Sequence, residues 1–93
     1  MQYRSRRIPS NADVTVVICG LQLTIPLIDV SETGMKLALA YEFPPDTAIT
    51  IQSARLHLHG VVSWSTQFET GVRLLQPLGK ADLGELAQIA WAA

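Results

Sequence analysis

Apolar and polar side chains alternate with a period of two through most of this chain of 93 residues. The alternation is clearest over residues 13–19 and 21–29, and Gly20 separates the two runs. Because successive side chains of a β-strand point to opposite faces, this pattern predicts two strands joined by a tight turn. Pro26 has no N–H to donate to a neighbouring strand, so we expect it at an edge or a bulge.

The same period recurs in four later segments that are separated by short connections. We expect the third to sixth strands at about residues 35–40, 48–55, 56–64 and 68–75. Six strands within about 65 residues are too few for a two-sheet sandwich of immunoglobulin size. A closed or nearly closed barrel fits better, because closure removes exposed strand edges. The predicted fold class is therefore all-β, a six-stranded antiparallel barrel.

Near the end of the chain the period of the apolar residues changes to that of a helix. The residues at this spacing are Leu83, Leu86, Ala87, Ala90 and Trp91. They predict a C-terminal α-helix that begins at about residue 80 and packs its apolar face on the barrel.

The charges are unevenly distributed, although the net charge is only −1. Arg4, Arg6 and Arg7 give residues 1–12 a charge of +3, whereas residues 13–93 carry four basic and eight acidic side chains. We therefore expect a flexible basic arm, residues 1–12, and a barrel domain with its helix, residues 13–93. Three positive charges on an otherwise negative domain are too few for binding to a nucleic-acid polymer.

The composition excludes several other classes of protein. Hydrophobic residues make up 48% of the chain and charged residues 16%, which is typical of a globular domain. The single cysteine, Cys19, excludes an intrachain disulfide and a multi-cysteine zinc site. The most apolar stretch, residues 14–28, is shorter than a membrane span, and no secretory signal is visible. We therefore expect a cytoplasmic protein without membrane insertion.

The segment between the second and third strands, residues 29–34 (DVSETG), concentrates polar groups. In an extended chain Asp29 and Ser31 face the same side and present a carboxylate and a hydroxyl together. Gly34 allows a backbone turn with φ > 0 or the close approach of a ligand. Beside an arm of arginines, which stack on bases and bridge phosphates, this loop suits a ligand with purine and phosphate groups. The alternatives are a loop in which Asp29 or Ser31 caps its own backbone, and a solvated arm.

Three motifs follow one another along the chain. Residues 29–34 match the pattern D/N-x-S-x-x-G, residues 60–64 (GVVSW) are similar to G-x-V-x-W, and residues 70–74 (TGVRL) are similar to G-V-x-F. In their order and spacing these motifs resemble the PilZ family, the bacterial receptor domains for cyclic di-GMP. The resemblance covers nearly the whole chain.

This resemblance implies a six-stranded barrel whose outer face binds cyclic di-GMP. It implies that Asp29 and Ser31 hydrogen-bond the guanine edges and that Gly34 keeps the loop close. The arginines of the arm would fold over the ligand, stack on guanine and meet phosphate. The candidate ligand-binding residues are Arg4, Arg6, Arg7, Asp29, Ser31 and Gly34.

The arm departs from the family pattern R-x-x-x-R, because no two of its arginines lie four residues apart. Four residues after Arg6 the chain has Ser10. Two functions therefore remain open. The first is a signalling module that binds cyclic di-GMP between the arm and the loop. The second is a degenerate PilZ domain that does not bind it and acts through a protein partner or self-association, for which the mean hydropathy of +0.24 is favourable.

Other polar and aromatic residues indicate no further chemistry. His57 and His59 lie two residues apart on a strand, and we expect a solvent-facing pair rather than a metal site. We expect the aromatic residues in the core or in an interface: Phe43, Trp64, Phe68 and Trp91. Nothing resembles a nucleophile elbow or an oxyanion loop. We therefore predict no enzyme, no metal and no cofactor apart from the candidate ligand.

Overall fold

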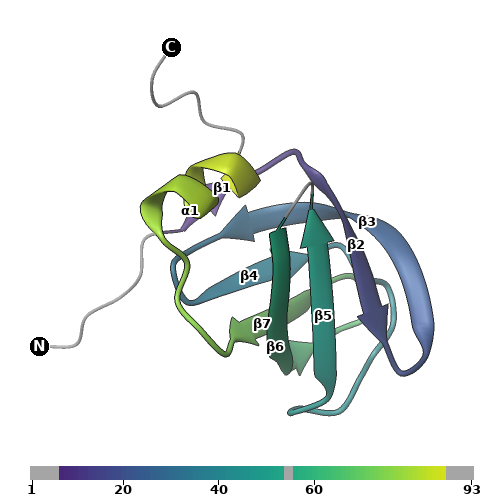
Figure 1. The fold of residues 1–93 in the computed structure, drawn as a ribbon. Helices are drawn as coiled ribbons and strands as arrows, with labels where there is room; N and C mark the ends of the chain where they lie inside the picture. Colours follow the sequence, from purple (N-terminus) through teal and green to yellow (C-terminus); the bar gives the residue numbers. More distant parts are fainter. Residues whose placement is uncertain (1–6, 54–55, 88–93) are drawn as a thin grey trace, which may run out of the picture.

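The computed structural model describes residues 7–53 and 56–87, and this part of the chain forms strands and one helix (Figure 1). The elements are β1 (Ile8–Pro9), β2 (Asp13–Ile18), β3 (Leu21–Val30), β4 (Gly34–Leu37), β5 (Ala48–Ser53), β6 (Leu56–Ser65), β7 (Thr70–Leu74) and α1 (Lys80–Ala87). All the strand pairs are antiparallel, and β3 pairs with both β2 and β4. The six strands from β2 to β7 thereby close into a barrel, which confirms the predicted fold class.

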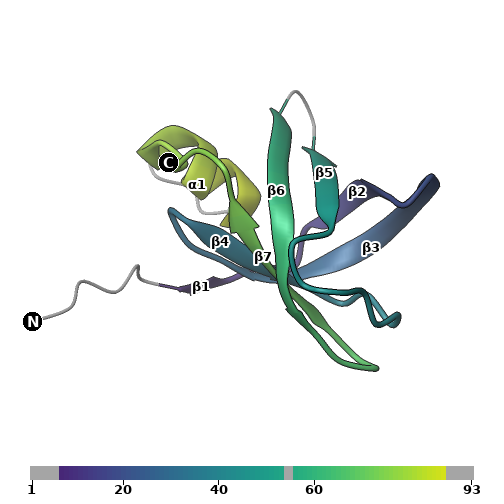
Figure 2. The ribbon, with the colours of Figure 1, turned by 90° about the horizontal axis from the view of Figure 1, so that it is seen from below.

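The strand β1 lies outside this barrel and was not predicted (Figure 2). It pairs with β3 through Ile8 opposite Val30 and Pro9 opposite Asp29. The pairing of β2 with the same strand begins where Asp13 lies opposite Pro26. Both therefore run along β3 in one direction, and the end of the expected flexible arm is fastened to the barrel. Residues 1–6 of that arm lie outside the described residues.

The barrel wall alternates as the sequence predicts, with one set of side chains in the core. Val14, Val16 and Ile18 of β2 are at most 1% exposed, and Ile49 and Ile51 of β5 face them across the β2–β5 pairing. The other buried apolar side chains of the strands are Leu27, Val30, Met35, Leu37, Val62, Val72 and Leu74. Burial of these apolar side chains is the main force that holds the barrel together.

The helix α1 lies at one end of the barrel, next to β1 and β3 (Figure 1). Leu86 and Ala87 are buried and Leu83 packs against the core, as the helical spacing predicts. The helix begins at Lys80, as expected. Ala90 and Trp91, the last two residues of the predicted apolar face, lie outside the described residues.

The turn between β2 and β3 is the predicted tight turn. Cys19 and Gly20 both have positive φ, 50° and 78°. A two-residue hairpin with both central residues in this region matches the twist of its strands, and glycine adopts it without steric cost. Pro26 lies at the end of the β2–β3 pairing, just before a bulge between Leu27 and Asp29, in agreement with the prediction.

Two strands are shorter than predicted. The strand β4 ends at Leu37, because its partner β7 begins at Thr70, which pairs with Leu37. The expected strand over residues 68–75 begins only at Thr70, because the hydroxyl of Thr66 accepts hydrogen bonds from the N–H groups of Phe68 and Glu69 and closes a turn. Phe68 is 78% exposed in this turn, so it does not lie in the core, and its alternative place in an interface stays a prediction.

Candidate ligand-binding site

The pairing of β1 with β3 brings the last arginine of the arm to residues 29–34, which we call the motif loop. Arg7 directly precedes β1, and its Nη1 lies 2.6 Å from Oδ1 of Asp29. The Arg7 side chain is half exposed, whereas that of Asp29 is only 15% exposed. The structure thus brings together two of the predicted site residues, which are 22 positions apart in the sequence. Arg4 and Arg6 lie outside the described residues.

A second cation borders the same carboxylate. Nζ of Lys36 lies 3.6 Å from Oδ2 of Asp29 and 3.9 Å from Oε1 of Glu69. Lys36 is in this position because it pairs with Asp29 in the β3–β4 ladder. The Asp29 carboxylate is therefore held in one orientation at the outer wall. Lys36 is a site residue that the sequence analysis missed, since only the pairing of β3 and β4 brings it to Asp29.

Ser31 lies beneath the loop and does not face outward beside Asp29. It is 2% exposed, and its Oγ accepts from the N–H of Gly34 at 3.2 Å. A further contact joins its Oγ to the carbonyl of Gly34 at 3.3 Å. Ser31 therefore caps its own loop, which is one of the two alternatives that the sequence left open. Its direct contact with a ligand stays a prediction.

Gly34 is required by the close approach of β7. A Cβ atom on Gly34 would lie 2.6 Å from the carbonyl oxygen of Val72, which is far inside van der Waals contact. The φ of Gly34 is not among the positive values in the described chain. Strand-to-strand packing, and not a turn with positive φ, therefore requires this glycine, whereas the close approach of a ligand stays a prediction.

Two further backbone hydrogen bonds hold the loop. The N–H of Leu74 donates to the carbonyl of Thr33 at 2.9 Å, and the N–H of Leu78 donates to that of Glu32 at 2.7 Å. These two bonds tie the loop to the end of β7 and to the segment that leads into α1. A site on this loop is therefore built on backbone that hydrogen bonds hold in place.

Ser10, which stands where the family pattern has its second arginine, is directed toward the helix. Its Oγ donates to the carbonyl of Leu86 at 2.7 Å and accepts from the N–H of Ala12 at 3.1 Å. The carbonyl groups of the last turn of a helix have no partner within the helix, so this hydroxyl satisfies one of them. The side chain at this position contacts α1 and takes no part in the Arg7–Asp29 arrangement.

We expect the Ser10→Ala substitution to destabilise the domain by about 1 kcal/mol, because a part-buried hydrogen bond between the segment after β1 and the helix α1 is lost. Urea denaturation followed by circular dichroism measures this change in the free energy of unfolding. Ser63→Ala is the matched control, since Ser63 is exposed. Equal stability of the two variants would contradict a stabilising role for the Ser10–Leu86 bond.

A hollow of about 140 Å³ opens on the outer wall beside the loop. The residues around it include Arg7, Gly34, Ser63, Trp64, Gly71 and Arg73. Trp64 is 39% exposed here and lies against the backbone of Gly71, where a Cβ atom would clash with the indole ring. This hollow was not predicted from the sequence, because the pairing of Gly71 with Trp64 depends on the register of β6 and β7.

Trp64 lies on the outer wall, although unbroken alternation along β6 would place it on the same face as Val62. Val62 pairs with Val72, but Trp64 pairs with Gly71, so β6 contains one extra residue at this point. Such a bulge shifts the alternation by one, and the side chain after it changes face. Val62 is therefore fully buried, whereas Trp64 lies on the outer wall.

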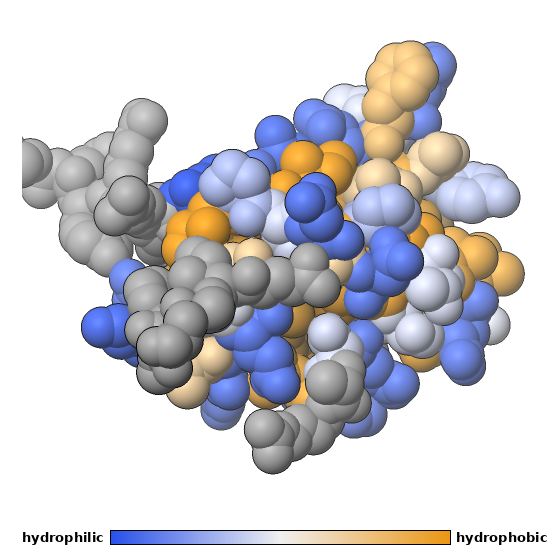
Figure 3. Space-filling model, turned by 90° about the horizontal axis from the view of Figure 1, so that it is seen from above, coloured by the Kyte–Doolittle hydropathy of each residue, from blue (hydrophilic) through white to orange (hydrophobic). Residues whose placement is uncertain are grey.

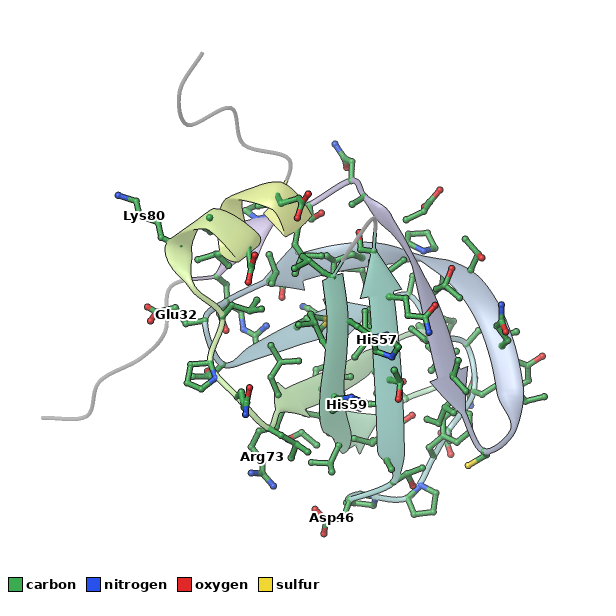
Figure 4. The ribbon with its side chains drawn as sticks, viewed as in Figure 1. Glu32, Asp46, His57, His59, Arg73 and Lys80 are labelled. Atoms are coloured by element: carbon green, nitrogen blue, oxygen red, sulfur yellow. The ribbon has the colours of Figure 1, made fainter. Side chains whose placement is uncertain are left out.

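The two histidines of β6 project outward on another part of the wall (Figure 4). The ring centroids of His57 and His59 are 5.4 Å apart, and both residues are exposed, as expected. They border a separate hollow of about 230 Å³ with the apolar side chains of Leu58, Leu74 and Leu75. Within residues 7–53 and 56–87, no group of three or more His, Cys, Asp or Glu side chains gathers as metal ligands do.

The chain is similar to known proteins at the level of a family. The family model of the PilZ domain matches residues 2–90. No curated protein matches the chain. In the described part of the chain, no helix has the length and apolar character needed to span a membrane.

Proposed function

Because the chain belongs to the PilZ family, whose domains are binding and signalling modules, we propose that it binds cyclic di-GMP on the outer wall of the barrel. The observation that carries the proposal is the contact of Arg7 with Asp29, which brings the last arginine of the arm to the motif loop. This arrangement places a guanidinium and an oriented carboxylate side by side at the surface. PilZ domains as a class take such a ligand, and the chain retains the whole loop motif.

The chemistry of the two side chains suits a guanine nucleotide. The N1–H and the N2 amino group of guanine are donors, and the Asp29 carboxylate is an acceptor whose two oxygens are spaced to receive both. Arg7 uses Nη1 for Asp29, and a guanidinium has five N–H donors in all, so others can reach a phosphate oxygen. Ser31 and Gly34 act in this proposal as positioning residues that shape the loop.

We expect isothermal titration calorimetry to show binding of cyclic di-GMP that weakens as salt increases, because charged groups meet the phosphates. Arg7→Ala is expected to weaken binding about tenfold or more, since a charge-assisted hydrogen bond contributes about 1.5–3 kcal/mol. Arg6→Ala is expected to weaken it too. His57→Ala is the control, because His57 lies on β6 away from the loop, and its affinity should equal that of the wild type.

The absence of heat and of competition at tens of micromolar cyclic di-GMP would overturn the proposal. GMP serves as the second ligand in the same titrations. A response to GMP equal to that of cyclic di-GMP would show general binding of a nucleotide phosphate and would contradict recognition of the cyclic dinucleotide.

One observation favours the second function, a PilZ domain that acts through protein contacts alone. Several large apolar side chains are exposed: Leu21 by 46%, Tyr41 by 58%, Phe68 by 78% and Leu75 by 60%. On the face drawn in Figure 3, hydrophobic residues occur at several separate places among hydrophilic ones. Sedimentation equilibrium tests this function, which predicts self-association or partner binding that does not change with cyclic di-GMP. A clean monomer whose melting temperature rises with the nucleotide would exclude it.

A further inference from the structure

The hollow beside the loop is bordered by positive charge from two separate segments. Arg7 comes from the start of β1, and Arg73 comes from β7, where it pairs with Gly34 of the motif loop. The Arg73 side chain points outward from the barrel wall (Figure 4). Within the described part of the chain Arg73 has no ion-pair partner. The ion pairs there join Asp29 to Arg7 and Lys36, and Lys36 to Glu69. No acidic residue borders the hollow.

Between the two arginines the hollow is bordered by one aromatic residue, Trp64, together with Thr33, Gly34, Ser63, Gly71 and Val72. The indole ring of Trp64 is held against the backbone of Gly71, and 39% of the residue is exposed. The ring is therefore fixed by the backbone on one side and available to a ligand where it borders the hollow. An aromatic surface beside guanidinium groups is the arrangement that binds a base together with its phosphate.

The size of the hollow limits what it can hold. Its volume is about 140 Å³, whereas pockets for whole drug-sized ligands range from about 300 to 1,000 Å³. It can therefore take one base or one phosphate group of a larger ligand. The rest of such a ligand would lie over Arg7, which lines the hollow, and over Asp29, which Arg7 contacts.

Ser10 stands where the family pattern has its second arginine, so a second guanidinium for the ligand has to come from another part of the chain. Its hydroxyl is bonded to the carbonyl of Leu86 in α1, so this position of the arm faces the helix. A second guanidinium is nevertheless present on the same wall as Arg7, and it belongs to Arg73.

We propose that Arg73 and Trp64 form a second part of the ligand site, in which Arg73 provides the guanidinium that the arm lacks and Trp64 stacks on a guanine base. This inference rests on the proposed function, because its ligand is cyclic di-GMP. It adds two residues outside the loop motif and the arm to the binding surface. The geometry also makes the site composite, with contributions from β1, β3, β6 and β7.

The first test is titration calorimetry of cyclic di-GMP with Arg73→Ala and Arg73→Lys. We expect Arg73→Ala to weaken binding about tenfold to a hundredfold and to reduce its salt dependence, because a charge-assisted contact is lost. Arg73→Lys should recover part of the affinity, since it keeps the charge but not the planar fork. The thermal stability of both variants should equal that of the wild type, because Arg73 is exposed.

The second test uses the fluorescence of Trp64. The chain has two tryptophans, Trp64 and Trp91, so the variant Trp91→Phe leaves Trp64 as the only indole. Cyclic di-GMP should quench its emission at the same concentrations that give heat. Trp64→Ala should weaken binding about fivefold to a hundredfold, whereas Phe68→Ala, which removes an aromatic ring that is 78% exposed outside the hollow, should not.

The outcomes separate this inference from the proposed function. Suppose that the wild type binds cyclic di-GMP and that Arg7→Ala weakens binding. If the Arg73 and Trp64 variants then bind normally and the emission of Trp64 is not quenched, only the second part of the site is overturned. If the wild type does not bind cyclic di-GMP, both proposals are overturned. Weakened binding by Arg73→Ala and quenching at Trp64, with unchanged stability, would support both.

Discussion

The Gly34→Ala variant is expected to be less stable than the wild type by about 2–3 kcal/mol. The new Cβ atom would lie 2.6 Å from the carbonyl oxygen of Val72, and this oxygen belongs to the backbone of β7. A flexible side chain could turn away from such a contact, but a strand in a closed barrel can move only together with its neighbours. The β4–β7 pairing, which includes Gly34 opposite Arg73, would have to open.

The matched control for this variant is Gly79→Ala, which makes the same chemical change. A Cβ atom on Gly79 would have no atom within 4 Å, and its φ is not in the positive region. Urea denaturation should show a lower midpoint for Gly34→Ala and nearly the wild-type midpoint for Gly79→Ala. Because the clash lies at the loop, Gly34→Ala should also weaken cyclic di-GMP binding. Equal midpoints for the two variants would contradict the close approach of β7.

The Asp29→Asn variant is expected to lose most of the affinity for cyclic di-GMP, by about tenfold to a hundredfold. The carboxylate lies between Arg7 and Lys36 and is the acceptor that the proposed site offers to guanine. Asparagine keeps the shape of this side chain, but it replaces one acceptor oxygen with a donor and removes the charge. A loss of charge-assisted hydrogen bonds of about 1.5–3 kcal/mol gives a change in affinity of this size.

Stability measurements separate this loss from unfolding. The Arg7 side chain is half exposed, and exposed ion pairs contribute at most about 1 kcal/mol, so Asp29→Asn should fold as the wild type does. Asp46→Asn is the matched control, because Asp46 lies in the β4–β5 loop and its φ of 69° is one that asparagine also adopts. Binding by Asp29→Asn at wild-type affinity would show that the carboxylate does not contact the ligand.

The six strands of the barrel and the helix could be predicted from the sequence because each has a local pattern. The alternation in β2 and β3 follows from the geometry of an extended chain. The tight turn depends only on the two residues that form it, Cys19 and Gly20. Closure into a barrel could be inferred as well, since six short strands with one apolar face have few other ways to cover their edges. What the alternation could not predict was its interruption at the bulge that precedes Trp64.

The candidate site was predictable only in part. Asp29 could be found from its motif, but its partners Arg7 and Lys36 come from the registers of β1 and β4 on β3. The hydroxyl of Ser31 could have faced a ligand or its own loop, and the local sequence is compatible with both. Its burial at 2% exposure depends on the strands that close over the loop.

The sequence by itself determined the all-β barrel, the C-terminal helix and the presence of the loop motif beside a basic arm. The elements and the motif follow from patterns that can be read along the chain, and the barrel follows from the need of the strands to cover their edges. The tertiary structure decided that Arg7 contacts Asp29, that Ser10 binds the end of α1, and that Arg73 and Trp64 border the loop. Each of these contacts joins segments that are far apart in the chain, and their positions follow from strand register and bulges, which no local pattern encodes.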